Sequence, residues 1–465
     1  MRPMKNQQDW EDLLNEFDAG DRKKALGKLV SKCLPKELPA ENNVNMHLHS
    51  FFSYNAEGWS PSRIAWESNK AGRYAAGLCD FDVLDGLDEV LEAGRALRLR
   101  TAVNLETRAF LKEYAAAEIS SPGEPGVTYI MGAGFARVPA EGSPQAQELA
   151  GYRERAKARN LALIARINSR LTRIPIDYAE DVIPLTPAGV ATERHIVAAY
   201  VSKSRTVFEN PTAAGTFWMG VLGKKSLDDV VMLMADTPAF EETVRAKLVK
   251  RGGVGYEQPS AGTFPLVDEF VRWVLSCEAI PMITWLDGTS AGERDPRALL
   301  ECMMAKGTAA LNIIPDRNWN ISNLDARAGK TANLKTMVTA ADDLHLPINI
   351  GTEMNKAGLP FVDDLNGLSL HAYRKTFLRG ARVMVGHTVL SRYAGFSYVG
   401  TKAVAEFTAV AAKNDFFEAV GALSALDERQ AGQLEDRGPE KALDWFRDEQ
   451  GLDHTAHPDG PCRHA

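Results

Sequence analysis

The chain has 465 residues, 45% of them hydrophobic, so it can bury a large core and form either several domains or one enlarged α/β barrel. Its net charge of -7 argues against general binding to nucleic acid, which needs a basic surface. The five cysteines are odd in number and contain no CxxC pair, which is typical of a reducing compartment. The first residues lack an apolar signal core, and no apolar run reaches about eighteen residues. We therefore expect a cytoplasmic protein that does not enter a membrane.

Residues 1–42 predict an N-terminal helical extension, and from residue 43 short apolar runs alternate with segments of helical period. The runs predict strands at 44–48, 75–81, 101–106, 127–133, 280–286, 310–315 and 347–352. Alternation of buried strands with helices is typical of a parallel sheet, and seven such units can close into a barrel. The sequence therefore predicts an α/β fold built on a distorted, TIM-like (β/α)7 barrel.

A long helical stretch interrupts this alternation. We expect residues 43–143 and 279–450 to form the two parts of the barrel with its C-terminal helices, residues 144–278 to form a helical insertion or lid, and residues 451–465 to form a tail. The insertion contains the glycine-rich segment "KRGGVGYEQPSAGTF", which follows a helix and lacks the GK[ST] of a nucleotide-binding loop. It suits a mobile lid in which Tyr256 contacts the substrate. A packed subdomain without a catalytic role is an equal alternative.

Two histidines one residue apart stand at the end of the first strand, in "VNMHLHS". Residues two apart in a strand face the same side, so His47 and His49 would project together. In a barrel this end of the strand is where active sites are assembled. Two imidazoles at this spacing can bind one divalent ion. Two ordinary histidines, one buried and one exposed, are the alternative for an isolated motif of this kind.

Acidic residues at other strand ends favour the metal site. They are Asp80, Asp82, Glu106, Asp287, Asp316 and Glu353. A single acid after a strand is often a helix cap. Several carboxylates at one rim would repel one another and lose hydration, and a bound cation would relieve both costs.

"HLHSFFS", "SPSRIAWESNKAG", "GLCDFD" and "VNLETR" together resemble the PHP (polymerase and histidinol phosphatase) superfamily of metal-dependent phosphoesterases. The resemblance covers mainly residues 43–112. It implies a PHP-type barrel in which His47, His49 and Glu106 bind metal, together with Asp80 and Glu353. The chain departs from the family pattern at three ligand positions, where it has Phe81, Trp285 and Asn355.

Fewer nitrogen ligands imply one or two ions, and we expect Mn, Zn or Mg, with the oxygen-rich ligand set favouring Mn or Mg. For catalysis itself the candidates are Asp82, Asp287 and His387, the last of which follows the apolar run "MVG". A structural histidine is the alternative at that position.

The candidate substrate-binding residues are cations and groups that suit a hydroxylated ring. They are Arg108, Arg317, Asn318, Trp319, Asn355 and Tyr256. An asparagine-rich turn around a core tryptophan is an equal interpretation of residues 318–320. Arg194 and Arg251 are further cations, for which a surface position is the better interpretation.

The sequence thus predicts a metal-dependent hydrolase, a phosphoesterase that acts on a small phosphorylated or sugar-like molecule, with no nucleic-acid or membrane partner. Two alternatives stay open: a sugar-acid isomerase or lactonase, and a degenerate barrel that binds a carbohydrate or metabolite without catalysis. The sequence does not decide between a monomer and a homo-oligomer.

Overall fold

The computed structural model describes residues 6–33, 43–260 and 262–449. Within them one seven-stranded sheet has its strands in chain order. The strands are β1 (Val44–Leu48), β2 (Ala75–Phe81), β3 (Arg100–Phe110), β4 (Val127–Ala133), β5 (Ile280–Trp285), β6 (Ala310–Ile313) and β7 (Ile348–Ile350). A parallel bridge between Leu48 and Glu353 joins the first and last strands, so the sheet curls into a nearly closed barrel. The predicted fold class is confirmed.

The prediction of an all-parallel sheet is wrong for β4, which runs antiparallel to both β3 and β5. The reason lies in the connection between β3 and β4. It contains only the short turn η1 (Lys112–Tyr114) and no crossover helix, and a chain that returns without a crossover pairs antiparallel. Residues 266 and 110 form a further bridge beyond this pair.

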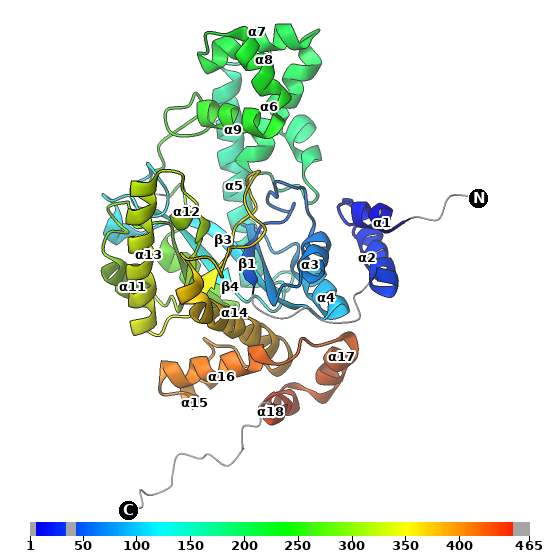
Figure 1. Ribbon diagram of the computed structural model, residues 1–465, viewed down its shortest axis with the longest axis vertical. Coiled ribbons are helices and arrows are strands. Elements are labelled where there is room, and N and C mark those ends of the chain that lie inside the picture. The colour runs from blue at the N-terminus through cyan, green and yellow to red at the C-terminus, as the bar shows by residue number, and fades with distance from the viewer. Residues whose placement is uncertain (1–5, 34–42, 261, 450–465) are drawn as a thin grey trace, which may run out of the picture.

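The helices around the barrel bury one large hydrophobic core. On its sides lie α3 (Pro61–Lys70), α4 (Leu87–Leu97), α10 (Val267–Ser276), α11 (Pro296–Met304), α12 (Asp316–Trp319) and α13 (Leu324–Asp343). Below it in Figure 1 lie α14 (Arg374–Val389), α15 (Thr401–Glu406), α16 (Val410–Ala422), α17 (Glu428–Arg437) and α18 (Pro439–Glu449). The predicted N-terminal extension contains α1 (Gln7–Leu13) and α2 (Ala19–Cys33). The predicted tail at 451–465 lies outside the described residues.

A second hydrophobic cluster belongs to the helices above the barrel in Figure 1. These are α5 (Pro144–Asn168), α6 (Glu193–Val207), α7 (Pro211–Leu222), α8 (Leu227–Ala235) and α9 (Thr237–Leu248), with the short turns η2 (Tyr178–Val182) and η3 (Ile183–Leu185). The cluster runs from Leu163 to Val249, whereas α10 packs on the barrel core. Throughout the described ranges, no helix combines the length and apolar character needed to cross a membrane.

Candidate metal centre

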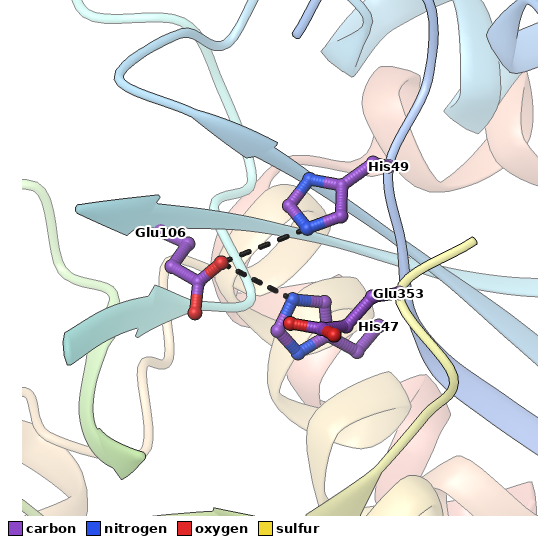
Figure 2. A group of neighbouring side chains, drawn as sticks. All are labelled: His47, His49, Glu106 and Glu353. Atoms are coloured by element: carbon purple, nitrogen blue, oxygen red, sulfur yellow. Dashed lines mark ion pairs between the residues drawn. The ribbon is translucent and has the colours of Figure 1, made fainter. Parts of the chain in front are cut away.

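Strand β1 brings two histidines to the mouth of the barrel. His47 and His49 are both fully buried. Their Nε2 atoms lie 3.5 Å and 3.6 Å from one atom, Oε2 of Glu106. Figure 2 shows both rings turned toward this carboxylate. His47 and His49 therefore face the same side, as expected, and both rings point toward an acidic side chain.

Glu106 reaches the same point from β3. The parallel register sets Glu106 opposite Phe81 and Asn104 opposite Cys79. Side chains alternate along a strand, so the residues at 104, 106 and 108 share the inner face of the barrel. Glu106 is almost completely buried, and burial raises its pKa, an effect that the charge of His47 opposes.

Glu353 completes the group from the segment that follows β7. Its N–H donates to the carbonyl oxygen of His47 over 2.8 Å, and its own carbonyl accepts the N–H of His49 over 2.9 Å. Its backbone is left-handed, with φ of 64°, a conformation that is uncommon outside glycine and concentrated at functional sites. Burial would raise the pKa of Glu353, but the charges of Arg317 and His47 outweigh burial and lower it.

The four side chains fit a divalent ion. One ligand atom from each of His47, His49, Glu106 and Glu353 can be chosen so that all four lie within 4.8 Å of one another. Three buried atoms at the centre, Nε2 of each histidine and Oε2 of Glu106, have no hydrogen-bond partner. Two ligands bound tetrahedrally at about 2.1 Å would lie about 3.4 Å apart, close to the nitrogen–oxygen distances found here. Buried polar atoms without partners are costly, and a shared cation would satisfy all of them.

A hydrogen-bond chain fixes the ring of His49. Ser53 Oγ donates its only proton to Asp80 Oδ1 over 2.6 Å. It can therefore only accept from His49 Nδ1, which lies 3.2 Å away. The proton then sits on Nδ1, and the lone pair on Nε2 faces Glu106 and the centre. Burial lowers the pKa of His49 to about 3, an effect that the nearby charge of His47 reinforces, so this imidazole stays neutral.

The structure places Asp80 beside the group of four. Asp80 stands between Cys79 and Phe81 in β2, and side chains alternate along a strand, so the side chain of Asp80 leaves the opposite face from theirs. Its carboxylate accepts three hydrogen bonds: from the N–H and the Oγ of Ser50, at 2.7 Å each, and from the Oγ of Ser53. Asp80 thus orders the loop after β1 and acts on His49 through Ser53.

Phe81 occupies the inner position next to the histidines. Its ring stacks on that of His49, with centroids 4.9 Å apart and an interplanar angle of 8°. The family pattern that the sequence resembles has a histidine at this position. Here the aromatic ring packs against His49 and offers no ligand atom.

Comparisons with known proteins find distant similarity to solved structures. No protein-family model matches the chain, and no curated protein matches it. A structure described as a "putative metal-dependent phosphoesterase" from Bifidobacterium adolescentis shares 18% identity, covers 73% of this chain and 98% of its own, and has a TM-score of 0.44. An amidohydrolase from Chromobacterium violaceum, with bound sulfate and no metal, shares 15% identity, covers 69% and 91%, and has a TM-score of 0.46. The chain is distantly similar in structure to both.

Two of the predicted substrate cations lie at this mouth. Arg317 Nη2 contacts Glu353 Oε2 over 2.8 Å and keeps 44% of its side chain exposed. The charge of Glu353 raises the pKa of Arg317 and outweighs the effect of burial. Arg108 Nη1 contacts Glu124 Oε2 over 2.9 Å. Asp82, predicted as catalytic, is buried on a left-handed backbone and accepts a hydrogen bond from Thr107 Oγ1 over 2.6 Å.

The remaining predicted substrate residues have the following contacts and burial. Asn318 is buried, and its amide donates to the carbonyl oxygens of Leu286 and Ile314. Trp319 packs against the barrel core, with its indole N–H 3.5 Å from Asp363. The asparagine-rich turn around a core tryptophan is the interpretation that these contacts favour. Asn355 is half-buried two residues after Glu353, and Tyr256 contacts Gln258.

Two predicted catalytic groups have other partners. Asp287 accepts from the N–H and the hydroxyl of Thr289 and pairs with Lys330 over 2.7 Å, which together outweigh burial and lower its pKa. His387 lies on α14 against Gly134, which follows β4. Because β4 is antiparallel, that point is at the end of the barrel opposite the metal centre. The prediction that His387 acts catalytically at this centre is therefore wrong. The structural alternative is supported by a hydrogen bond that His387 Nδ1 accepts from the Tyr398 N–H over 3.1 Å.

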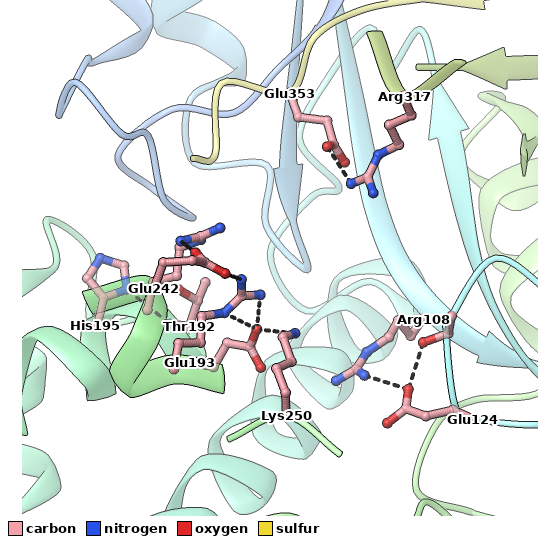
Figure 3. A network of polar contacts seen from close by, with 12 residues as sticks. Arg108, Glu124, Thr192, Glu193, His195, Glu242, Lys250, Arg317 and Glu353 are labelled. Atoms are coloured by element: carbon pink, nitrogen blue, oxygen red, sulfur yellow. Dashed lines mark hydrogen bonds and ion pairs between the residues drawn. The ribbon is translucent and has the colours of Figure 1, made fainter. Parts of the chain in front are cut away.

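Sequence reasoning missed the charged side chains that the insertion brings to the mouth. Figure 3 shows Glu193, Lys250, Arg108 and the Glu353–Arg317 pair directed into a common region. Lys250 Nζ contacts Glu193 over 2.7 Å. Arg194, for which a surface position was favoured, pairs with Glu242 and lies over the ring of Tyr54. No spacing in the sequence could have shown these contacts, because the residues that meet are far apart in the chain.

Proposed function

We propose that the protein is a metal-dependent hydrolase that cleaves a phosphoester in a small polar molecule. The observation that carries the proposal is the group of four buried histidine and glutamate side chains whose ligand atoms converge, three of them without a hydrogen-bond partner. Buried groups of this kind are retained where they bind a cation or a substrate.

One divalent ion suits this site. His47, His49, Glu106 and Glu353 would hold it, and an imidazole–carboxylate set accepts Zn or Mn more readily than Mg, which prefers oxygen ligands alone. When bound, such an ion polarises a phosphoryl oxygen and lowers the pKa of a coordinated water. Phe81 fills the neighbouring inner position, which argues for a single ion.

The chain's own groups would position the phosphoester. Arg317 is held by Glu353 through one nitrogen, and its exposed part leaves other N–H donors for phosphoryl oxygens. Its fixed positive charge would offset the negative charge that develops on those oxygens. His49 is oriented by Ser53, so the reactive geometry does not have to be assembled when the substrate binds.

The test combines metal content with hydrolysis. We expect the purified protein, after incubation with Mn or Zn, to retain about one ion per chain. The His47→Ala, His49→Ala double variant should retain none, whereas His371→Ala, at an exposed histidine, should behave as the parent. The loaded parent should release phosphate from phenyl phosphate. Metal binding without phosphoester hydrolysis, but with turnover of a lactone or uronate, would contradict the proposed reaction; unchanged metal content in the double variant would contradict the site.

A further inference from the structure

Two arginines from different parts of the chain contact one aromatic ring near the barrel mouth. The guanidinium carbon of Arg108, on β3, lies 4.4 Å from the centroid of the Phe264 ring. That of Arg159, on α5 of the insertion, lies 4.8 Å from the same centroid. Phe264 itself is 4% exposed. The ring thus holds two positive charges close together, each with part of its side chain accessible.

The carboxylates nearby do not fully satisfy these cations. Glu124 contacts Arg108 directly, but Asp82 Oδ2 is 3.7 Å from Arg159, which is too long for a hydrogen bond. Arg155 adds a third positive charge to the same neighbourhood, and its buried Nε has no hydrogen-bond partner. Burial, together with the charges of Arg108 and Arg155, lowers the pKa of Arg159 to about 10 despite Asp82. Glu193 is a third carboxylate whose charge acts on Arg108, but it is already paired with Lys250 and Arg245. The three guanidinium groups therefore share only Asp82 and Glu124 as carboxylates without other cationic partners, which leaves a local excess of positive charge.

The position of this group relative to the metal centre follows from β3. Arg108 is two residues beyond Glu106, so both side chains leave the same face of the strand, about 7 Å apart along it. Tyr129, opposite Arg108 in the antiparallel register, is half-buried on that face, and its ring lies 6.1 Å from that of Phe81. A continuous inner surface therefore connects the ligand group to the arginines.

We propose that Arg108 and Arg159 form a second anion-binding subsite, which makes the substrate a small phosphoester bearing another anionic group. This inference rests on the proposed function, because it assigns the scissile phosphoryl group to the metal centre and the second carboxylate or phosphoryl group to the arginines. The insertion then supplies a specificity-determining residue, Arg159, and forms part of the site. An anion bound there would relieve the repulsion between the guanidinium groups.

The test compares phenyl phosphate with the ortho, meta and para carboxyphenyl phosphates and with the corresponding phenylene bisphosphates. We expect kcat/KM to be at least tenfold higher for one or more of the doubly anionic compounds, and the better of the two series identifies the second group. Arg159→Gln should reduce this preference at least fivefold. Arg166→Gln, which removes another ion-paired arginine of α5, should keep it. If Arg159→Gln does not fold, Arg159→Lys keeps the charge, loses the forked geometry and should show a smaller preference.

Calorimetric binding to the metal-free protein separates the two proposals. Tighter binding of the doubly anionic compounds that is lost in Arg159→Gln, without hydrolysis of any compound, would support the subsite and contradict the proposed function. Hydrolysis without any preference, or a preference that survives in Arg159→Gln, would overturn the subsite and leave the proposed function standing.

Discussion

The backbone of Glu353 is hydrogen-bonded to that of His47: the N–H of Glu353 donates to the carbonyl oxygen of His47 over 2.8 Å. The same segment forms the bridge that joins the last strand of the sheet to the first. Closure of the barrel and assembly of the ligand group are therefore one structural event. A change that opens this junction should weaken metal binding without touching a ligand atom.

Gly351→Ala tests this coupling. A Cβ at Gly351 would lie 2.4 Å from Asn45 Oδ1 and 2.5 Å from both the Cβ and the backbone nitrogen of His47. We expect a loss of about 1–3 kcal/mol in the free energy of unfolding, together with weaker Mn binding, because the junction must widen. Chemical denaturation and metal titration measure both. Gly329→Ala, within α13 and with nothing near the added Cβ, should not lower either quantity, and an equal response in the two variants would refute the coupling.

Ser53→Ala removes the hydroxyl that links Asp80 to His49 Nδ1. We expect metal affinity to fall by about 10–100-fold, because the ring of His49 loses the partner that orients it. Competition titration against a coloured chelator gives the affinity. Ser31→Ala removes an exposed hydroxyl and serves as the control. Unchanged affinity in Ser53→Ala would show that the hydroxyl does not orient the ligand.

Arg317→Gln removes the positive charge paired with Glu353. The buried carboxylate then lacks its counter-charge, so a bound cation should stabilise the variant more than it stabilises the parent. We expect the metal-free variant to have a lower Tm than the parent and to show a larger rise in Tm when Mn is added. Arg297→Gln, which breaks an exposed pair with Glu301, should respond to Mn as the parent does. Equal rises in Arg317→Gln and the parent would contradict this prediction.

His387 should make the protein sensitive to acid. Burial lowers the pKa of His387 to about 3, below the ordinary value of 6.5. Between these two values the unfolded chain binds a proton that the folded chain does not, so stability falls as the pH falls. His387→Gln should reduce the slope of unfolding free energy against pH by up to about 1.4 kcal/mol per pH unit in this window, although it lowers stability overall. Denaturation at a series of pH values measures the slope, and the same slope in His387→Gln and the parent would be inconsistent with this account.

The sequence predicted the parts of the structure that depend on local pattern. The strand positions and the seven-stranded barrel follow from apolar runs, and the facing pair His47 and His49 follows from alternation along one strand. Glu106 and Glu353 could be proposed because each stands at the end of a predicted strand, although β3 continues beyond Glu106 to Phe110. The reversed direction of β4 was missed because strands are recognised by composition, which carries no direction.

The side chains that depend on contacts across the fold could not be predicted. Asp80 and Glu106 look equivalent in the sequence, yet strand alternation and register direct only Glu106 into the barrel. His387 was misplaced because an apolar run ending in a histidine suits a strand end, whereas it is part of α14. Arg159 was overlooked because its neighbours Phe264 and Asp82 are far away in the chain.

The central claim is that these four side chains bind a metal ion, and anomalous scattering from crystals grown with Mn tests it most directly. We predict one anomalous peak within about 2.0–2.3 Å of His47 Nε2, His49 Nε2 and carboxylate oxygens of Glu106 and Glu353. The peak should be absent in crystals of the His47→Ala, His49→Ala variant. A parent crystal that shows no peak among these residues, or one that shows Mn bound only elsewhere, would contradict the claim.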